Sequence, residues 1–122
     1  MARIDITNKI ERLKVFEEQL GVTLESLSAF FLEYMSGDEK VFVLVTCGEL
    51  QATNGTKLKR NIDLLFEVHD TFGNIVKTTN LNFWQKIFFG MESFKIETWG
   101  LPISDISKIR IYPKEEKTYG RN

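Results

Sequence analysis

Hydrophobic and polar residues alternate most regularly over residues 61–69, where the even-numbered side chains are all apolar. An alternation of period two is typical of a β-strand with one face in the core and the other in solvent. Residues 70–73 follow, with Asp at the start and Gly at the end, a composition typical of a tight turn. A second β-rich run then covers residues 74–79. Together these segments predict a β-hairpin.

Residues 41–50 carry apolar side chains at odd and even positions alike. Apolar residues on both faces indicate a strand that is covered on two sides, so this run is predicted to be central in its sheet. Residues 93–99 and 107–112 show the alternation of half-buried strands, and Pro113 should end the pairing of the second because proline has no N–H to donate. Short strands separated by turns predict a mainly β fold, an antiparallel immunoglobulin-like β-sandwich.

The N-terminal third fits two interpretations. Its apolar residues recur at spacings of four, three and four, which is typical of a helix. These residues are Leu20, Leu24, Leu27 and Phe31. Residues 26–34 also alternate, however, and the turn signal at 36–39 would join a strand there to the strand that starts at Val41. We favour the strand for residues 26–34 and keep the helix as the alternative.

The length of 122 residues suits one domain with a single core. We divide this domain into an N-terminal element (1–23), a β-sandwich (24–113) and a flexible tail (114–122). Within the N-terminal element, residues 10–19 are rich in helix formers and Gly21 follows them. The sequence therefore predicts a short amphipathic helix that ends at this glycine.

The charge is nearly balanced, with 16 Lys and Arg against 17 Asp and Glu, which gives no electrostatic reason to expect a nucleic acid or membrane partner. The short basic cluster at residues 57–60 has no aromatic residues beside it. Cys47 is the single cysteine and His69 the single histidine, which excludes an internal disulfide and argues against a structural zinc site. Residues 1–14 are charged throughout and resemble no signal peptide, so we expect a cytoplasmic protein.

Candidate catalytic groups are few. His69 and Asp70 are adjacent, and neighbours on a strand point to opposite faces, so Asp70 is badly placed to orient the imidazole. We expect His69 to face solvent at a strand end and Asp70 to cap the turn. Carboxylate pairs at residues 17–18, 38–39 and 115–116 stand in polar surroundings and should be solvated. We therefore expect no catalytic, cofactor-binding or metal-binding residues, no cofactor, and a protein that is not an enzyme.

Residues 81–94 form the most unusual stretch, with many large apolar side chains and few charges. One interpretation is that this segment closes an end of the sandwich, with Asn82 capping a short helix. The other is a partly exposed aromatic surface for a protein partner, because aromatic residues are enriched in interfaces. The candidate partner-binding residues are Phe83, Trp84, Phe88 and Phe89.

The sequence Phe-Glu-Val-His-Asp at residues 66–70 resembles the signature Phe-x-Leu-Tyr-Asp of the FxLyD domain family, with Val in place of Leu and His in place of Tyr. Gly73 matches the family's D-x-x-G turn. Residues 90–94 look like its later G-E-x-x-F element, with the Glu displaced by one, and residues 47–50 are similar to its valine-rich strand with a glycine. The resemblance covers about residues 27–113. It implies an immunoglobulin-like β-sandwich without a catalytic centre, usually of unknown function.

These observations favour a non-catalytic protein-interaction module that binds a protein partner or associates with itself. The alternative is a small regulatory protein that binds and blocks an enzyme, as immunity proteins do. The edges of a sandwich can also accept a strand from a partner. The identity of the partner separates these two hypotheses.

Overall fold

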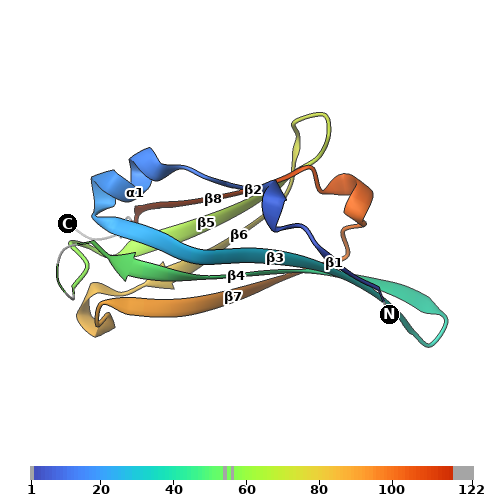
Figure 1. The fold of residues 1–122 in the computed structure, drawn as a ribbon, viewed down its shortest axis with the longest axis horizontal. Coiled ribbons are helices and arrows are strands. Elements are labelled where there is room, and N and C mark those ends of the chain that lie inside the picture. The colour runs from blue at the N-terminus through green and yellow to red at the C-terminus, as the bar shows by residue number, and fades with distance from the viewer. Residues whose placement is uncertain (1, 54, 56, 117–122) are drawn as a thin grey trace, which may run out of the picture.

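Two β-sheets make up most of the molecule, which the computed structural model describes over residues 2–53, 55 and 57–116 (Figure 1). The strands are β1 (Ala2–Asp5), β2 (Ile10–Arg12), β3 (Val22–Ser36), β4 (Glu39–Ala52), β5 (Ile62–His69), β6 (Ile75–Phe83), β7 (Met91–Trp99) and β8 (Lys108–Glu115). The helical elements are α1 (Lys14–Leu20) and three 3-10 turns, η1 (Thr7–Lys9), η2 (Gln85–Ile87) and η3 (Ile103–Asp105). The prediction of a mainly β fold is confirmed.

One sheet has the strand order β1-β3-β4-β7, and the other has the order β2-β8-β5-β6. All neighbours run antiparallel except β2 and β8, which are parallel. Both sheets contribute to one core cluster, as expected when two sheets bury their apolar faces against each other. The largest fully buried apolar side chains are Phe31, Leu24, Leu44, Leu50, Ile62, Leu64, Ile106, Ile109 and Ile111.

A long hairpin of β3 and β4 forms most of the first sheet, so the strand predicted for residues 26–34 is confirmed. The register shifts between Glu25 and Ser28, and Ser26 has a φ of 54° within this bulge. An extra residue moves the inward face from even to odd positions. Leu24 therefore points into the core before the bulge and Phe31 after it. This switch produced the spacing that also fitted a helix.

The N-terminal segment is not a separate element beside the sandwich, because it adds one strand to each sheet. The helix predicted over residues 10–19 is only partly present. Residues 10–12 form β2 along β8, and the helix itself is α1, which begins at Lys14. Gly21 ends α1 in the left-handed conformation with a φ of 69°, as predicted.

The hairpin of β5 and β6 is also confirmed. In its turn, one side-chain oxygen of Asp70 accepts hydrogen bonds from the backbone N–H groups of Phe72 and Asn74, both at 2.9 Å. Gly73 has a φ of 83° there, which only glycine adopts easily. Asp70 thus caps the turn as expected.

Two predictions about the C-terminal strand are wrong. Pro113 does not end the pairing, because β8 continues to Glu115 and Pro113 itself lies opposite Leu64. Strand β2 pairs with β8 only over residues 109–111, so a missing N–H on that side of Pro113 removes no ladder hydrogen bond. Residues 114–116 are likewise not a tail, since Glu116 donates its backbone N–H to the Asn61 carbonyl at 3.1 Å. The rest of the predicted tail, residues 117–122, lies outside the described residues.

Candidate functional site

The structure divides the four predicted partner-binding aromatics into two buried and two exposed residues. Phe83 and Phe88 are 4% and 3% exposed, and their rings pack edge to face with centroids 6.4 Å apart. Trp84 and Phe89 are 49% and 81% exposed. Phe83 and Phe88 therefore belong to the core at this end of the sandwich, and only Trp84 and Phe89 offer surface to a partner.

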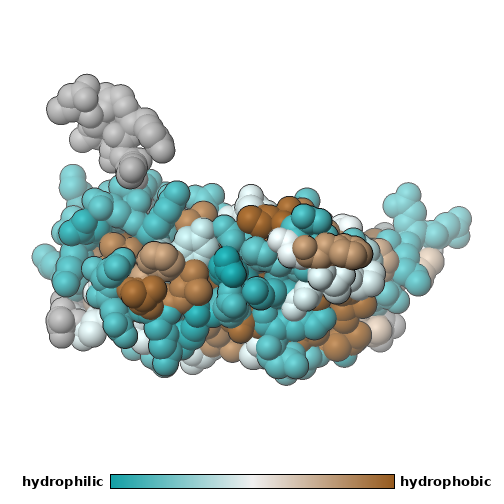
Figure 2. Space-filling view, turned by 90° about the horizontal axis from the view of Figure 1, so that it is seen from above, coloured by the Kyte–Doolittle hydropathy of each residue, from teal (hydrophilic) through white to brown (hydrophobic). Residues whose placement is uncertain are grey.

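Two further large apolar side chains are exposed in the same connection. Ile87 is 64% exposed and Met91 is 49% exposed. We call Trp84, Ile87, Phe89 and Met91 the β6–β7 tip. On the face that Figure 2 shows, hydrophobic side chains reach the surface in separate groups among hydrophilic ones. The tip is one concentration of such side chains within a short stretch of chain, as protein-binding surfaces often are.

The backbone under the tip is held by hydrogen bonds to a neighbouring loop. Gln85 donates its backbone N–H to the Asn61 side-chain oxygen at 2.8 Å and its side-chain amide to the Lys59 carbonyl at 3.2 Å. Ala52 donates its N–H to the Gly90 carbonyl at 2.9 Å. Asn82 does not cap a helix, as one interpretation of the sequence had it, because it lies in β6 and its side-chain amide donates to Asp63 and Glu116. The tip therefore presents apolar side chains from a fixed backbone.

A second apolar surface lies on the first sheet, on the side away from the core. The residues of β3 and β4 that alternate with the core residues Phe31 and Leu44 point to this side. They pair across the two strands as Phe30 with Val45, Leu32 with Val43, and Tyr34 with Val41. We call these six residues the outer apolar face.

The sequence interpretation of residues 41–50 as covered on two sides needs a correction. Helix α1 contacts β8 and the start of β3 (Figure 1), so in the described part of the chain the second sheet covers only the inner side of β4. Val43 is only 3% exposed although it belongs to the outer apolar face, because its strand neighbours Leu32 and Trp99 surround it. Residues 41–50 do carry apolar side chains on both sides of the strand, and those on the outer side form part of a surface.

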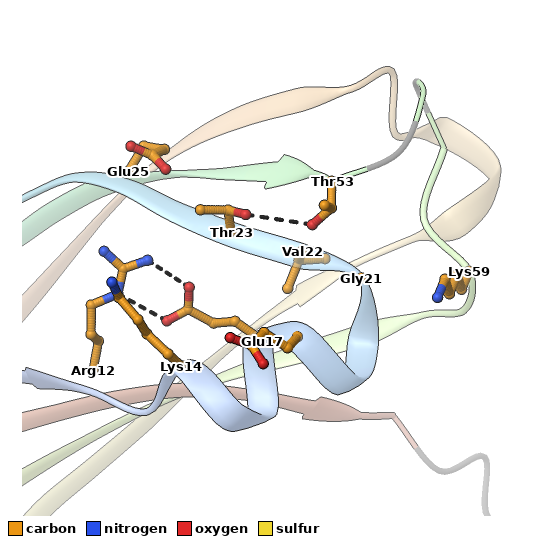
Figure 3. A pocket seen from close by; sticks show the side chains of 10 residues that line it. Arg12, Lys14, Glu17, Gly21, Val22, Thr23, Glu25, Thr53 and Lys59 are labelled. Carbon is orange, nitrogen blue, oxygen red and sulfur yellow. Dashed lines mark hydrogen bonds and ion pairs between the residues drawn. The ribbon is translucent and has the colours of Figure 1, made fainter.

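A cleft of about 510 Å³ lies between α1 and the start of β3 (Figure 3). Its most buried charged group is Glu17, which is 3% exposed, so the expectation that this carboxylate is solvated is wrong. Arg12 binds Glu17 through two nitrogens at 3.0 and 2.6 Å, which raises the pKa of the guanidinium despite its partial burial. Leu24 donates its N–H to Glu17 at 3.0 Å, and its carbonyl accepts from Arg12 at 2.6 Å. The ion pair thus serves to join β2, α1 and β3.

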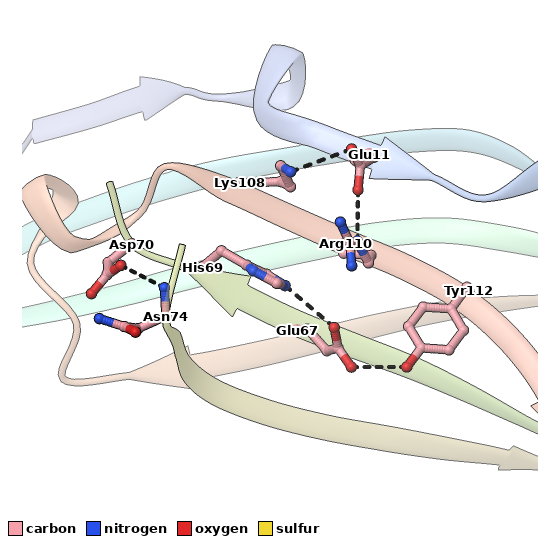
Figure 4. A network of polar contacts seen from close by, with 8 residues as sticks. All are labelled: Glu11, Glu67, His69, Asp70, Asn74, Lys108, Arg110 and Tyr112. Carbon is pink, nitrogen blue, oxygen red and sulfur yellow. Dashed lines mark hydrogen bonds and ion pairs between the residues drawn. The ribbon is translucent and has the colours of Figure 1, made fainter. Parts of the chain in front are cut away.

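A polar network covers the outer side of the second sheet (Figure 4). His69 was expected to face solvent, but it is buried, with 9% of its surface exposed. Its Nε2 lies 3.3 Å from a carboxylate oxygen of Glu67. The register shift between Val68 and His69 makes two successive residues buried at the end of β5. The Tyr112 hydroxyl donates a hydrogen bond to the other Glu67 oxygen at 2.8 Å. The pKa of Tyr112 is raised mainly by burial and, to a smaller extent, by this hydrogen bond. His69 and Tyr112 are therefore tied to one carboxylate.

Glu11 links β2 to β8 in the same region. It accepts a hydrogen bond from Arg110 Nε at 2.6 Å and lies 3.4 Å from Lys108 Nζ. The hydrogen bond to Arg110 is the main cause that lowers the pKa of Glu11. Stabilisation from a lowered carboxylate pKa is present above the unfolded pKa and is lost as pH falls through the folded pKa. The contribution is therefore complete at neutral pH.

Arg110→Gln should raise the pKa of Glu11 towards its usual value of 4.5, because the variant removes its strongest partner. Carboxyl chemical shifts of Glu11, followed by NMR during an acid titration, measure this directly. Lys108→Gln is the control and should change the pKa less, since Lys108 contributes less than Arg110. The difference in melting temperature between wild type and Arg110→Gln should narrow as pH falls from 4.5 through the lowered pKa of Glu11. Equal pKa shifts in both variants would contradict the assignment.

The described residues hold no helix with the length and apolar character that crossing a membrane requires. Over the same part of the chain, no three His, Cys, Asp or Glu side chains gather as a metal ion would need. The basic residues of the 57–60 cluster are separated by Leu58, which is buried at 2% exposure. Comparison of the chain with protein-family models, curated proteins and solved structures gives no match.

Proposed function

We propose that this protein is a non-catalytic interaction module that binds a partner protein through the β6–β7 tip. The observation that carries the proposal is the exposure of Trp84, Ile87, Phe89 and Met91 within eight residues, on a backbone fixed by hydrogen bonds. Exposed apolar side chains on a fixed backbone lose little conformational entropy of the main chain on binding. Trp84 and Phe89 are two of the four residues that the sequence analysis selected.

The chemistry of the tip favours an apolar groove or pocket as its complement. Phe89 is the most exposed of the four side chains and stands beside the buried Phe88, so it projects from a rigid base. The exposed side chains of Lys86, within the tip segment, and of Glu92, directly after it, add one charge of each sign. An apolar centre with a polar rim is the usual anatomy of protein interfaces.

The buried or half-buried carboxylates elsewhere support a non-catalytic function because their oxygens bind other groups of the fold. Glu17 is committed to Arg12 and to the backbone of Leu24. Glu67 is committed to His69 and Tyr112. In each case the carboxylate connects strands or helices that neighbour one another.

Phe89→Ser tests the proposal, with Phe72→Ser as the matched control. Both phenylalanines are more than 80% exposed, at 81% and 87%, but Phe72 lies in the β5–β6 turn. Immobilised wild type should capture a partner from extract, and the partner should then bind in purified form. Phe89→Ser should weaken that affinity by about 10-fold or more, as for an interface hot spot. Phe72→Ser should bind as wild type does.

Both variants should melt near the wild-type temperature, because neither side chain is in the core. A partner that binds Phe89→Ser as tightly as wild type would reject the tip as its site. Turnover of a substrate by the purified protein, abolished by changing one carboxylate, would reject the non-catalytic function.

We also propose that the sandwich is immunoglobulin-like, related to the FxLyD domains, and that the protein is cytoplasmic. Two observations support the first proposal. The chain crosses between sheets so that β4 pairs with β7 and β5 pairs with β8. The turn at Asp70 and Gly73 has the form that the FxLyD signature implies. The single cysteine supports the second proposal, since disulfides are usual in secreted domains of this size.

A further inference from the structure

The outer apolar face is bordered by charged edge strands. On the β1 side, Arg3 lies opposite Leu32 and Asp5 lies opposite Phe30. On the β7 side, Lys95 and Glu97 point outward next to Trp99. Each edge therefore carries one cation and one anion on this side of the sheet. An apolar centre between charged edges has the composition of an interface.

The side chain of Arg3 covers part of the outer apolar face. Its guanidinium carbon lies 4.2 Å from the centroid of the Phe30 ring, in a cation–π contact. The ring of Phe30 is thus partly shielded by a side chain from the edge strand. Leu32, Val41 and Val45 are half-buried.

The order of the charges along the edge strands favours a second copy of this chain as the partner of the outer apolar face. A partner surface of a single sign would repel one charge of each edge, whereas a second copy of the same face can match both charges of the β1 edge. The strand register places Arg3 in one row with Leu32, Val43 and Trp99, and places Asp5 in a row with Phe30, Val45 and Glu97. These two rows are two residues apart along the strands.

A two-fold axis that lies across the strands, between these two rows, exchanges one row for the other. Arg3 of one copy then faces Asp5 of its partner, and the symmetry repeats the pair. In the middle, Leu32 faces the partner's Phe30 and Val43 faces the partner's Val45. The strands of the two copies remain nearly aligned, as is usual when sheets pack face to face.

We propose that the outer apolar face is the interface of a symmetric homodimer. Four strands spaced about 4.8 Å apart and about seven residues long cover roughly 450 Å² on each copy. The two copies together bury about 900 Å² when the sheet is treated as flat, which is near the lower end of the surface areas buried in specific interfaces. The dimer should therefore be weak, with a dissociation constant in the micromolar range or above. It uses a different surface from the β6–β7 tip and does not depend on the proposed function.

Sedimentation velocity over a range of protein concentrations tests this dimer, with Val45→Glu as the disrupting variant. Wild type should shift from monomer to dimer as its concentration rises. Val45→Glu should remain monomeric at concentrations at least 30-fold higher, because it buries a charge at the centre of the interface. Leu65→Glu is the matched control, since Leu65 is a half-buried residue on the outer side of the other sheet, on the central strand β5. This control should dimerise like wild type.

Two further readouts separate the proposed geometry from other forms of association. Arg3→Glu should weaken the dimer, since it places a like charge opposite Asp5. Cys47 lies on the same side of β4, opposite Ser28 and Lys95, so its alkylation should slow as wild-type protein becomes more concentrated, but not in Val45→Glu. Alkylation at the same rate in both proteins at high concentration would contradict the interface.

A wild type that stays monomeric at millimolar concentration would overturn the proposal. A Val45→Glu protein that still dimerises would overturn it as well, as would a control that dissociates. Phe89→Ser should dimerise normally. If Phe89→Ser is monomeric while Val45→Glu dimerises, the tip is the self-association site and the outer apolar face is not. Failure of partner capture through the tip, with the dimer intact, would reject only the proposed function.

Discussion

Replacing Phe88 by alanine should lower the free energy of unfolding by about 3–5 kcal/mol, the usual cost of removing a large aromatic side chain from a core. Phe88 is 3% exposed and packs edge to face on Phe83. Phe83 contacts Phe94 with ring centroids 6.4 Å apart, and Phe94 contacts Phe66 at 5.6 Å. The variant removes the outermost ring of this aromatic series and leaves a cavity at the end of the sandwich.

Phe89→Ala is the internal control, because the same residue type at the next position is 81% exposed. It should change the free energy of unfolding by no more than about 0.5 kcal/mol. Urea unfolding of the two variants, followed by circular dichroism, measures both values. Similar losses at the two positions would mean that the tip packs as core, and the partner site would then have to be sought elsewhere.

This pair shows how far the sequence alone could lead. The density of aromatic residues marked a segment of which two of the four chosen residues, Trp84 and Phe89, are large exposed side chains, and their role in binding stays a prediction. The choice between Phe88 and Phe89 could not be made from the pattern, because the segment has neither helical nor strand periodicity. The turn η2 sets which ring points inward, and the hydrogen bonds of Gln85 to Asn61 and Lys59 hold that turn. Those partners lie more than twenty residues away in the sequence.

Local regularity explains most of the other outcomes. The hairpin of β5 and β6 was predictable because buried and outer residues of β5 alternate regularly from Ile62 to Val68, with Leu65 as the one apolar residue on the outer side. Strand β3 fitted two interpretations because the bulge after Glu25 changes which positions face inward. Strand β2 has only three residues and pairs with β8 almost a hundred residues later, so no local pattern marks it. Nonlocal pairing therefore set the limit for the N-terminal segment.

The outer apolar face was visible in the sequence but was assigned a different meaning. Val41, Val43 and Val45 alternate with core residues of β4, which correctly indicated apolar side chains on both sides. The inference of a covering element followed from the behaviour of strands buried on both sides. A face covered by a second copy of the chain has the same sequence pattern. The sequence pattern shows that both faces of the strand are apolar. Only the arrangement of the sheets shows whether the same chain covers the second face or leaves it to a binding partner.

Arg12→Ala should lower the free energy of unfolding by about 3 kcal/mol or more, because it leaves a buried carboxylate without its counter-charge. The Glu17 side chain is 4% exposed, and Arg12 is its ion-pair partner at 2.6 Å. The variant also removes the hydrogen bond from Arg12 to the Leu24 carbonyl, next to the bulge of β3. The loss should therefore loosen the contacts of α1 with β3 and β8.

Arg60→Ala is the matched control, since Arg60 and Glu115 form an ion pair at 2.8 Å with side chains that are 48% and 53% exposed. An exposed pair contributes little, so this variant should lose no more than about 1 kcal/mol. The double variant Arg12→Leu with Glu17→Leu separates the charge from its surroundings. It should be more stable than Arg12→Ala, because replacing both partners by apolar residues removes the uncompensated charge. If the double variant is less stable than the single one, the hydrogen bonds to Leu24, and not the burial of an unpaired charge, dominate the contribution of this ion pair.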